Sequence, residues 1–123
     1  MGYIDNIEEK TVNNTNFRTV LYTGAHMQLV VMSLKPLEEI GMEVHENVDQ
    51  FFRFEKGQGK IIMNGEETMV GENMVAIVPA GTNHNVINTS ETEDLKLYTI
   101  YAPANHPDGT IHVTKADAMA AGD

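Results

Sequence analysis

Four polar side chains in two separate blocks of the sequence have the types and spacing of metal ligands. Glu43, His45 and Gln50 form the first block, and His84 stands in the second, behind a Pro-x-Gly turn. Two residues that are two positions apart point to one face of a strand, so Glu43 and His45 are expected to project together, with Gln50 in reach after a turn. One carboxylate, two imidazoles and an amide oxygen make a mixed ligand set for a divalent metal ion.

The two blocks resemble the two motifs of the cupin superfamily. That family's first motif reads glycine, His-x-His, glutamate and glycine, and its second reads glycine, Pro-x-Gly, histidine and asparagine. The matching positions here are Leu37, Glu43, His45, Gln50 and Gly57, then Gly71, Pro79, Gly81, His84 and Asn88.

Three identities in the first motif depart from the family. Leu37 replaces the glycine, Glu43 the first histidine and Gln50 the glutamate. In the second motif, the stretch from Gly71 to the Pro-x-Gly turn is longer than in the family. Asn73 stands nearer the usual position of the motif's glycine and, like glycine, can adopt a left-handed conformation. Because a neutral amide replaces a carboxylate, the site either binds its metal less tightly or serves as a hydrogen-bonding pocket without metal.

The resemblance covers about residues 28–117 and is to small single-domain cupins. It implies an all-β jelly-roll barrel with a divalent ion inside, where zinc, iron, manganese and nickel all suit the ligands. It also implies a small-molecule ligand. Members of this kind include dioxygenases, isomerases and decarboxylases, and fold alone does not select among them.

Composition excludes several other classes of function. The 123 residues contain 8 basic and 18 acidic side chains, for a net charge of -10, which argues against binding nucleic acid or an anionic membrane. Cysteine is absent, so thiolate chemistry and disulfides are excluded. No apolar run approaches the roughly 20 residues that a membrane helix requires. We therefore expect a cytoplasmic protein.

The turn signals divide the chain into short β segments, as a sandwich or barrel requires. We expect a flexible segment over residues 1–16, one barrel over 17–113, and a short helix and tail over 114–123 that begins with Thr114 as N-cap. Asn64-Gly65 predicts a two-residue hairpin. The predicted strands are 17–22, 26–34, 41–45, 50–55, 59–64, 67–70, 75–78, 84–88, 95–102 and 111–113.

Strand parity also suggests the walls of a pocket. Phe52 and Phe54 share the face of Gln50, and Tyr101 is expected to point into the barrel. Gln28 lies within an apolar strand, where a hydrogen-bonded core role competes with a ligand-binding role. Outside these positions, His106 and His112 have no local partner at ligand spacing, so at most a supporting role is expected.

Three functions remain open at this point. The first is a metal-dependent enzyme acting on a small organic carboxylate, and the second is a module that binds or senses a small molecule without turnover. A sugar-phosphate isomerase-like activity is disfavoured, because Arg18 and Arg53 are the only arginines and Arg53 has the parity opposite to Gln50. We also expect a homodimer that pairs through the strand at residues 17–22.

Overall fold

The computed structural model describes residues 2–122, so residues 1 and 123 of the predicted terminal segments lie outside the described chain. It has nine strands and two short helices. In chain order they are α1 (Ile7–Asn13), β1 (Arg18–Thr23), β2 (Gln28–Leu34), β3 (Asp49–Lys56), β4 (Gln58–Met63), β5 (Glu66–Gly71), β6 (Val75–Val78), β7 (His84–Asn88), β8 (Leu95–Ala102), β9 (Ile111–His112) and α2 (Lys115–Ala120).

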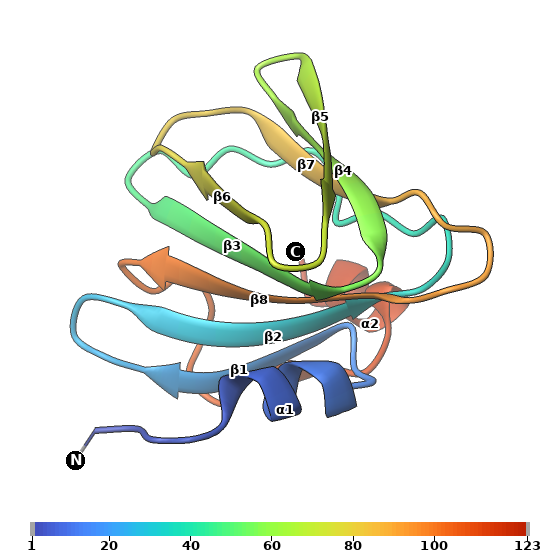
Figure 1. Ribbon diagram of the computed structural model, residues 1–123. Coiled ribbons are helices and arrows are strands. Elements are labelled where there is room, and N and C mark those ends of the chain that lie inside the picture. Colours follow the sequence, from blue (N-terminus) through green and yellow to red (C-terminus); the bar gives the residue numbers. More distant parts are fainter. Residues whose placement is uncertain (1, 123) are drawn as a thin grey trace.

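The strands form two antiparallel sheets that face each other (Figure 1). The larger sheet has the order β6-β3-β8-β2-β1-β9, and the smaller has the order β5-β4-β7. Strict alternation along β3 buries Gln50, Phe52 and Phe54 and turns Phe51 and Arg53 outward. This arrangement confirms the predicted all-β jelly roll, and the space between the sheets holds the apolar core.

The predicted turns agree closely with the structure. Asn64 and Gly65 both have positive φ, 49° and 85°, as the predicted two-residue hairpin requires. Asn73 takes a left-handed conformation with φ of 68°, as expected. Leu37, which stands where the cupin motif has glycine, keeps a φ of 63°, so the backbone shape of the motif persists without the residue that adopts it most easily.

Two predicted segments differ from the structure. Residues 1–16 were expected to be flexible, but residues 7–13 form α1, which is capped by Asn6 and buries Thr11 against the larger sheet. Residues 41–45 were predicted as a strand, but they lie in the loop between β2 and β3. Two isolated bridges, Glu39 to Ile87 and Glu43 to His84, connect this loop to β7. Thr11 is the one buried position of α1, so the helix lacks the apolar stripe that would reveal it in the sequence.

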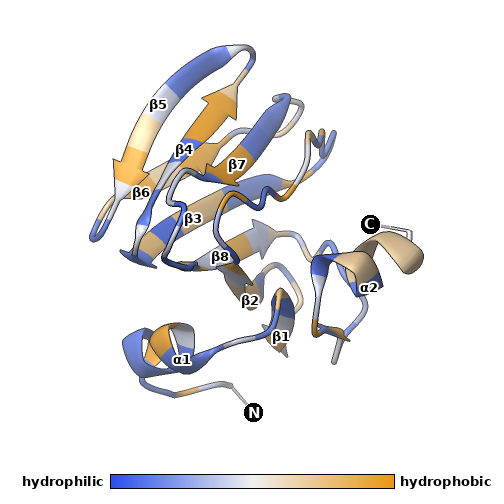
Figure 2. Cartoon of the chain, turned by 90° about the vertical axis from the view of Figure 1, so that its right-hand side faces the viewer, coloured by the Kyte–Doolittle hydropathy of each residue, from blue (hydrophilic) through white to orange (hydrophobic). Residues whose placement is uncertain are grey.

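The C-terminal helix begins as predicted. Thr114 accepts a hydrogen bond from the backbone of Asp117, and Asp117 accepts one from the backbone of Thr114, which completes a capping box. The helix places Ala118 in the core and lies at the open side of the two sheets (Figure 2). Neither helix of residues 2–122 has the length and apolar character that a membrane crossing requires.

Candidate metal centre

The loop between β2 and β3 carries two of the predicted ligands across the mouth of the barrel. Glu43 is bonded to His84 of β7 in both directions, with N···O distances of 2.8 and 2.9 Å between their backbones. These bonds fix the two residues side by side. The predicted common face of Glu43 and His45 is therefore achieved by a loop anchored on β7 and not by a strand.

Three of the four predicted ligands lie together. One ligand atom from each of Glu43, His45 and His84 falls within 4.8 Å of the others. Nε2 of His45 lies 3.7 Å from Oε2 of Glu43 and is buried without a hydrogen-bond partner. A buried nitrogen of this kind is costly unless something binds it. Its position beside a carboxylate and a second imidazole fits a divalent cation.

The fourth predicted ligand, Gln50, lies against His84. Nδ1 of His84 donates a hydrogen bond to the carbonyl oxygen of Thr82 at 3.0 Å, so Nε2 of the neutral ring carries the lone pair. Oε1 of Gln50 is 3.2 Å from that Nε2, while the Gln50 amide nitrogen donates to Thr99 at 3.0 Å. Two acceptors thus face each other. Atoms bound to one metal at about 2.0–2.2 Å have a similar separation.

The electrostatics of His45 favour its metal-binding form. Burial, followed by the neighbouring His84 and the positive charge of Arg18, lowers the pKa of His45. The ring is therefore neutral at pH 7, and its contact with Glu43 is not an ion pair. Neutral imidazole is the form that binds a metal ion.

Three of the predicted pocket residues surround this group and are buried. The Phe52 ring centroid is 6.2 Å from that of His84, and Phe54 stacks behind Phe52 at 6.3 Å. Tyr101 meets His45 edge to face at 5.9 Å. All three are at most 2% exposed, so they form a dry wall behind the metal group.

Gln28 instead holds a loop. Its amide nitrogen donates to Thr23 and to the carbonyl oxygen of His106, and its oxygen accepts from the backbones of Asn105 and His106. These bonds place the His106 ring against Tyr101, where Nε2 and the phenol oxygen are 3.3 Å apart. Gln28 therefore contacts the site through this loop, and His106 lies beside Tyr101.

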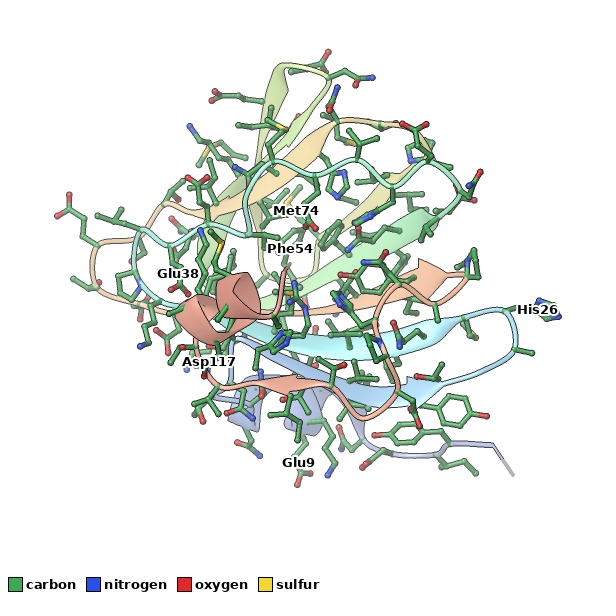
Figure 3. All side chains as sticks on the ribbon, turned by 180° about the vertical axis from the view of Figure 1, so that it is seen from behind. Glu9, His26, Glu38, Phe54, Met74 and Asp117 are labelled. Carbon is green, nitrogen blue, oxygen red and sulfur yellow. The ribbon has the colours of Figure 1, made fainter. Side chains whose placement is uncertain are left out.

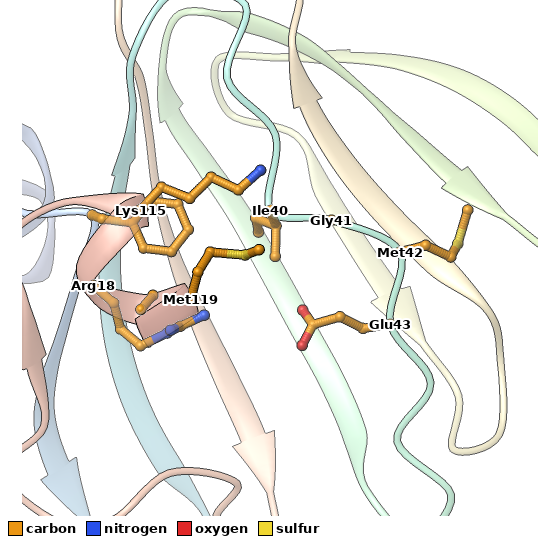
Figure 4. Close-up of a pocket in the computed structure, with 9 residues that line it drawn as sticks. Arg18, Ile40, Gly41, Met42, Glu43, Lys115 and Met119 are labelled. Carbon is orange, nitrogen blue, oxygen red and sulfur yellow. The ribbon is translucent and has the colours of Figure 1, made fainter. Parts of the chain in front are cut away.

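An open cavity of about 240 Å³ lies beside Glu43, and the sequence did not reveal its walls (Figure 4). It is bounded by the start of β1, the loop between β2 and β3, and α2. Arg18 is 2% exposed and lies on the same face of β1 as buried Val20. The alternation of β1 was therefore the sequence signal that could have predicted an inward-facing Arg18. The lining residues are Phe17, Arg18, Ile40, Gly41, Met42, Glu43, Lys115, Ala118 and Met119.

The second arginine lies elsewhere. Arg53 is on the outer face of β3, where Nε is 3.0 Å from Oε1 of Glu55 and Nη2 donates to Asn73 at 3.1 Å. The parity argument that turned Arg53 away from the site is confirmed. His26 is exposed at the tip of the β1–β2 hairpin (Figure 3).

Comparison with known proteins identifies the family. Residues 30–101 match the model of the Cupin domain, which is more than half of the chain. The chain belongs to the cupin family. This cupin is 51% identical to YrkC, an uncharacterized protein of Bacillus subtilis, over 98% of this chain and 68% of YrkC.

Two further relatives resemble this cupin over nearly its whole length. Protein L612 of Acanthamoeba polyphaga mimivirus is 44% identical over 98% of this chain and 77% of L612. The crystal structure of BH2720 from Bacillus halodurans has a TM-score of 0.95 and 44% identity, covering 98% of this chain and 95% of that one. The fold, α1 and α2 included, therefore has a counterpart in a solved structure.

Proposed function

We propose that this cupin binds one divalent metal ion through Glu43, His45, Gln50 and His84 and holds a small organic carboxylate at that ion. The observation that carries the proposal is the cluster of Glu43, His45 and His84, whose ligand atoms lie within 4.8 Å of one another around a buried, unbonded His45 nitrogen. Zinc, iron, manganese and nickel all accept such ligands. A bound ion of this kind supplies Lewis-acid activation of a carboxylate or carbonyl oxygen.

The chain's own residues orient and shield the ligands. The carbonyl of Thr82 fixes the tautomer of His84, and the hydroxyl of Thr99 holds the end of the Gln50 side chain beside that ring. Phe52 and Tyr101 exclude water behind the two imidazole rings. The side toward the cavity is the one left for a ligand, because Glu43 lines that cavity as well.

Charge favours an anionic ligand. Glu43 is the only carboxylate among the four proposed ligands, so a divalent ion would retain one unit of positive charge. That charge attracts a carboxylate or enolate more strongly than a neutral group. A small organic acid is therefore the ligand class that this site suits best.

The first test is metal content. Protein expressed with each of the four metals should contain about one equivalent per chain, and His45→Ala should weaken binding more than the roughly 10–100-fold loss typical of outer-shell partners. His26→Ala is the matched control, because His26 is exposed. Less than about a tenth of an equivalent in the supplemented wild type would reject the metal site. NMR of added acids then separates an enzyme, which converts them, from a binding module, which does not.

One observation supports a metal-free pocket as the second candidate. If the Gln50 amide is rotated by 180°, its nitrogen donates to Nε2 of His84 and its oxygen accepts from the Thr99 hydroxyl, so both contacts become ordinary hydrogen bonds. This arrangement satisfies Gln50 and His84 but leaves Nε2 of His45 without a partner. We therefore rank it second, and metal content decides between the two.

A further inference from the structure

The cavity beside Glu43 has a different chemical character at its two ends. Glu43 belongs both to the cavity lining and to the metal group, so one end opens on the proposed ion. Arg18 and Lys115 lie in the lining as well, and they bring two positive charges. Figure 4 shows Arg18 and Glu43 both directed into the space, from β1 and from the loop between β2 and β3.

The walls between these groups are apolar. Phe17, Ile40, Ala118 and Met119 contribute hydrocarbon, aromatic and thioether surface. A cavity with apolar walls and a few convergent polar groups is typical of small-molecule sites. Its volume of about 240 Å³ is below the roughly 300–1,000 Å³ of pockets for drug-sized ligands, so it suits a short carbon chain.

Arg18 is a buried cation held in a defined position. It is 2% exposed, Nη1 hydrogen-bonds Nδ1 of His112 at 3.1 Å, and the guanidinium lies 5.2 Å from the ring centroid of Phe17. Arg18 and His112 are direct partners across β1 and β9, so strand pairing fixes this contact. A planar guanidinium in a dry site matches the two oxygens of a carboxylate.

We propose that the cavity binds a short dicarboxylate, with one carboxylate at the metal ion and the other at Arg18. This inference rests on the proposed metal site and deepens it, because it names the ligand class. The apolar walls contact the methylene groups between the two carboxylates. Lys115, half-buried at the start of α2, adds a second positive charge at the cavity. His112 is a positioning residue that orients Arg18.

The test compares acids of matched chain length on the metal-loaded wild type. Calorimetry should show malonate binding at least about tenfold more tightly than propionate, and succinate more tightly than butyrate, since a charge-assisted hydrogen-bonded pair contributes a factor of this size. Equal affinities within either pair would overturn the inference, as would stronger binding of inorganic phosphate than of any dicarboxylate. This comparison uses only the native protein and does not depend on a variant that folds.

Variants locate the second carboxylate. Arg18→Gln should abolish the preference for dicarboxylates, so that each dicarboxylate binds about as tightly as its matched monocarboxylate, while Arg18→Lys, which retains the charge, should keep part of the preference. Arg53→Gln is the control, because Arg53 lies on the outer face of β3. A preference that survives in a folded Arg18→Gln protein would overturn the assignment to Arg18.

The two proposals fail in different ways. Absence of metal from the wild-type protein would reject the proposed function, because that function requires a bound metal ion. Bound metal with equal affinity for mono- and dicarboxylates would leave that function standing and reject only the second anchor. Bound metal without binding of any of these acids would reject both the dicarboxylate inference and the organic-acid part of the proposed function.

Discussion

Oε1 of Gln50 lies 3.2 Å from Nε2 of His84, and when the His84 ring is neutral and donates from Nδ1, both of these atoms are acceptors. Two lone pairs at this distance are repulsive unless a cation lies between them or the amide is rotated. Gln50 also stands at the position where the cupin motif has glutamate. The identity of this one side chain therefore sets the charge of the proposed metal centre.

Gln50→Glu is expected to tighten metal binding and weaken the binding of small carboxylates such as 2-oxo acids. The added carboxylate neutralises the remaining charge of a divalent ion, so metal affinity should rise by about tenfold or more. Calorimetry on both proteins measures the two effects. Gln58→Glu, at an exposed position of β4, adds the same charge away from the site. Unchanged metal affinity in Gln50→Glu would show that Gln50 is not a ligand.

Gln28→Leu is expected to destabilise the protein without removing the metal. The substitution leaves the backbone groups of Asn105 and His106 without the bonds that Gln28 now makes, and the free energy of unfolding should fall by about 2–4 kcal/mol. Urea unfolding provides the measurement, and Gln58→Leu, at an exposed site, should change it by less than about 0.5 kcal/mol. Wild-type stability combined with weaker acid binding would instead make Gln28 a ligand contact.

The sequence predicted the features that local patterns encode. Turn chemistry located the Asn64-Gly65 hairpin, and alternation gave the exact bounds of β6, β7 and β8. The motif spacing also predicted which side chains would lie near one another. The structure brings Glu43, His45 and His84 together, and Gln50 within reach of His84.

The cavity could not be predicted because it joins the two ends of the chain. Arg18 lines one cavity with Lys115 and Met119 only because β9 pairs with β1 and α2 packs beside β9. The residue pattern within β1 or within α2 cannot predict that residues almost a hundred positions apart lie close together. The pocket predicted at Phe52, Phe54 and Tyr101 rested on strand alternation. Alternation shows on which face of a sheet a side chain lies, but it does not show how closely that face is packed.

Gly57→Ala is expected to be strongly destabilising although the added group is one methyl. Gly57 ends the first cupin motif with a φ of +96°, and a Cβ there would lie 2.5 Å from the carbonyl oxygen of Asp94 and 3.1 Å from Cα of Leu95. A left-handed conformation costs an alanine about 1–2 kcal/mol, and overpacking adds about 1–3 kcal/mol. The total is a large part of the about 5–15 kcal/mol that stabilises a domain.

Gly71→Ala is the matched control, since Gly71 begins the second motif. Its Cβ would meet only the carbonyl oxygen of Gly57, at 3.7 Å, and its φ is not positive. Its free energy of unfolding should stay within about 1 kcal/mol of the wild-type value. Equal urea midpoints for the two variants would contradict this account of Gly57.

The predicted homodimer needs a surface other than the strand at residues 17–22. That strand is β1, and β9 already pairs with it at Arg18 and Thr19. On the outer face of the larger sheet, a row of partly or fully exposed apolar side chains crosses five strands in register. Its members are Ile77, Phe51, Ile100, Leu29 and Tyr22. An uncharged apolar row can pack on its own copy about a two-fold axis, so we assign the predicted dimer to this face.

Ile77→Glu is therefore expected to dissociate the dimer. Ile77 is 60% exposed at the edge of the row, so a charge there should leave the fold intact and oppose only burial against a second copy. Ile111→Glu is the control, because Ile111 is 58% exposed on β9 and outside the row. Sedimentation at micromolar concentration should give twice the 13.6 kDa of the chain for the wild type and the control, and 13.6 kDa for Ile77→Glu. A wild-type protein that sediments as a 13.6 kDa monomer would reject the dimer, whereas a dimeric Ile77→Glu protein would reject only this face.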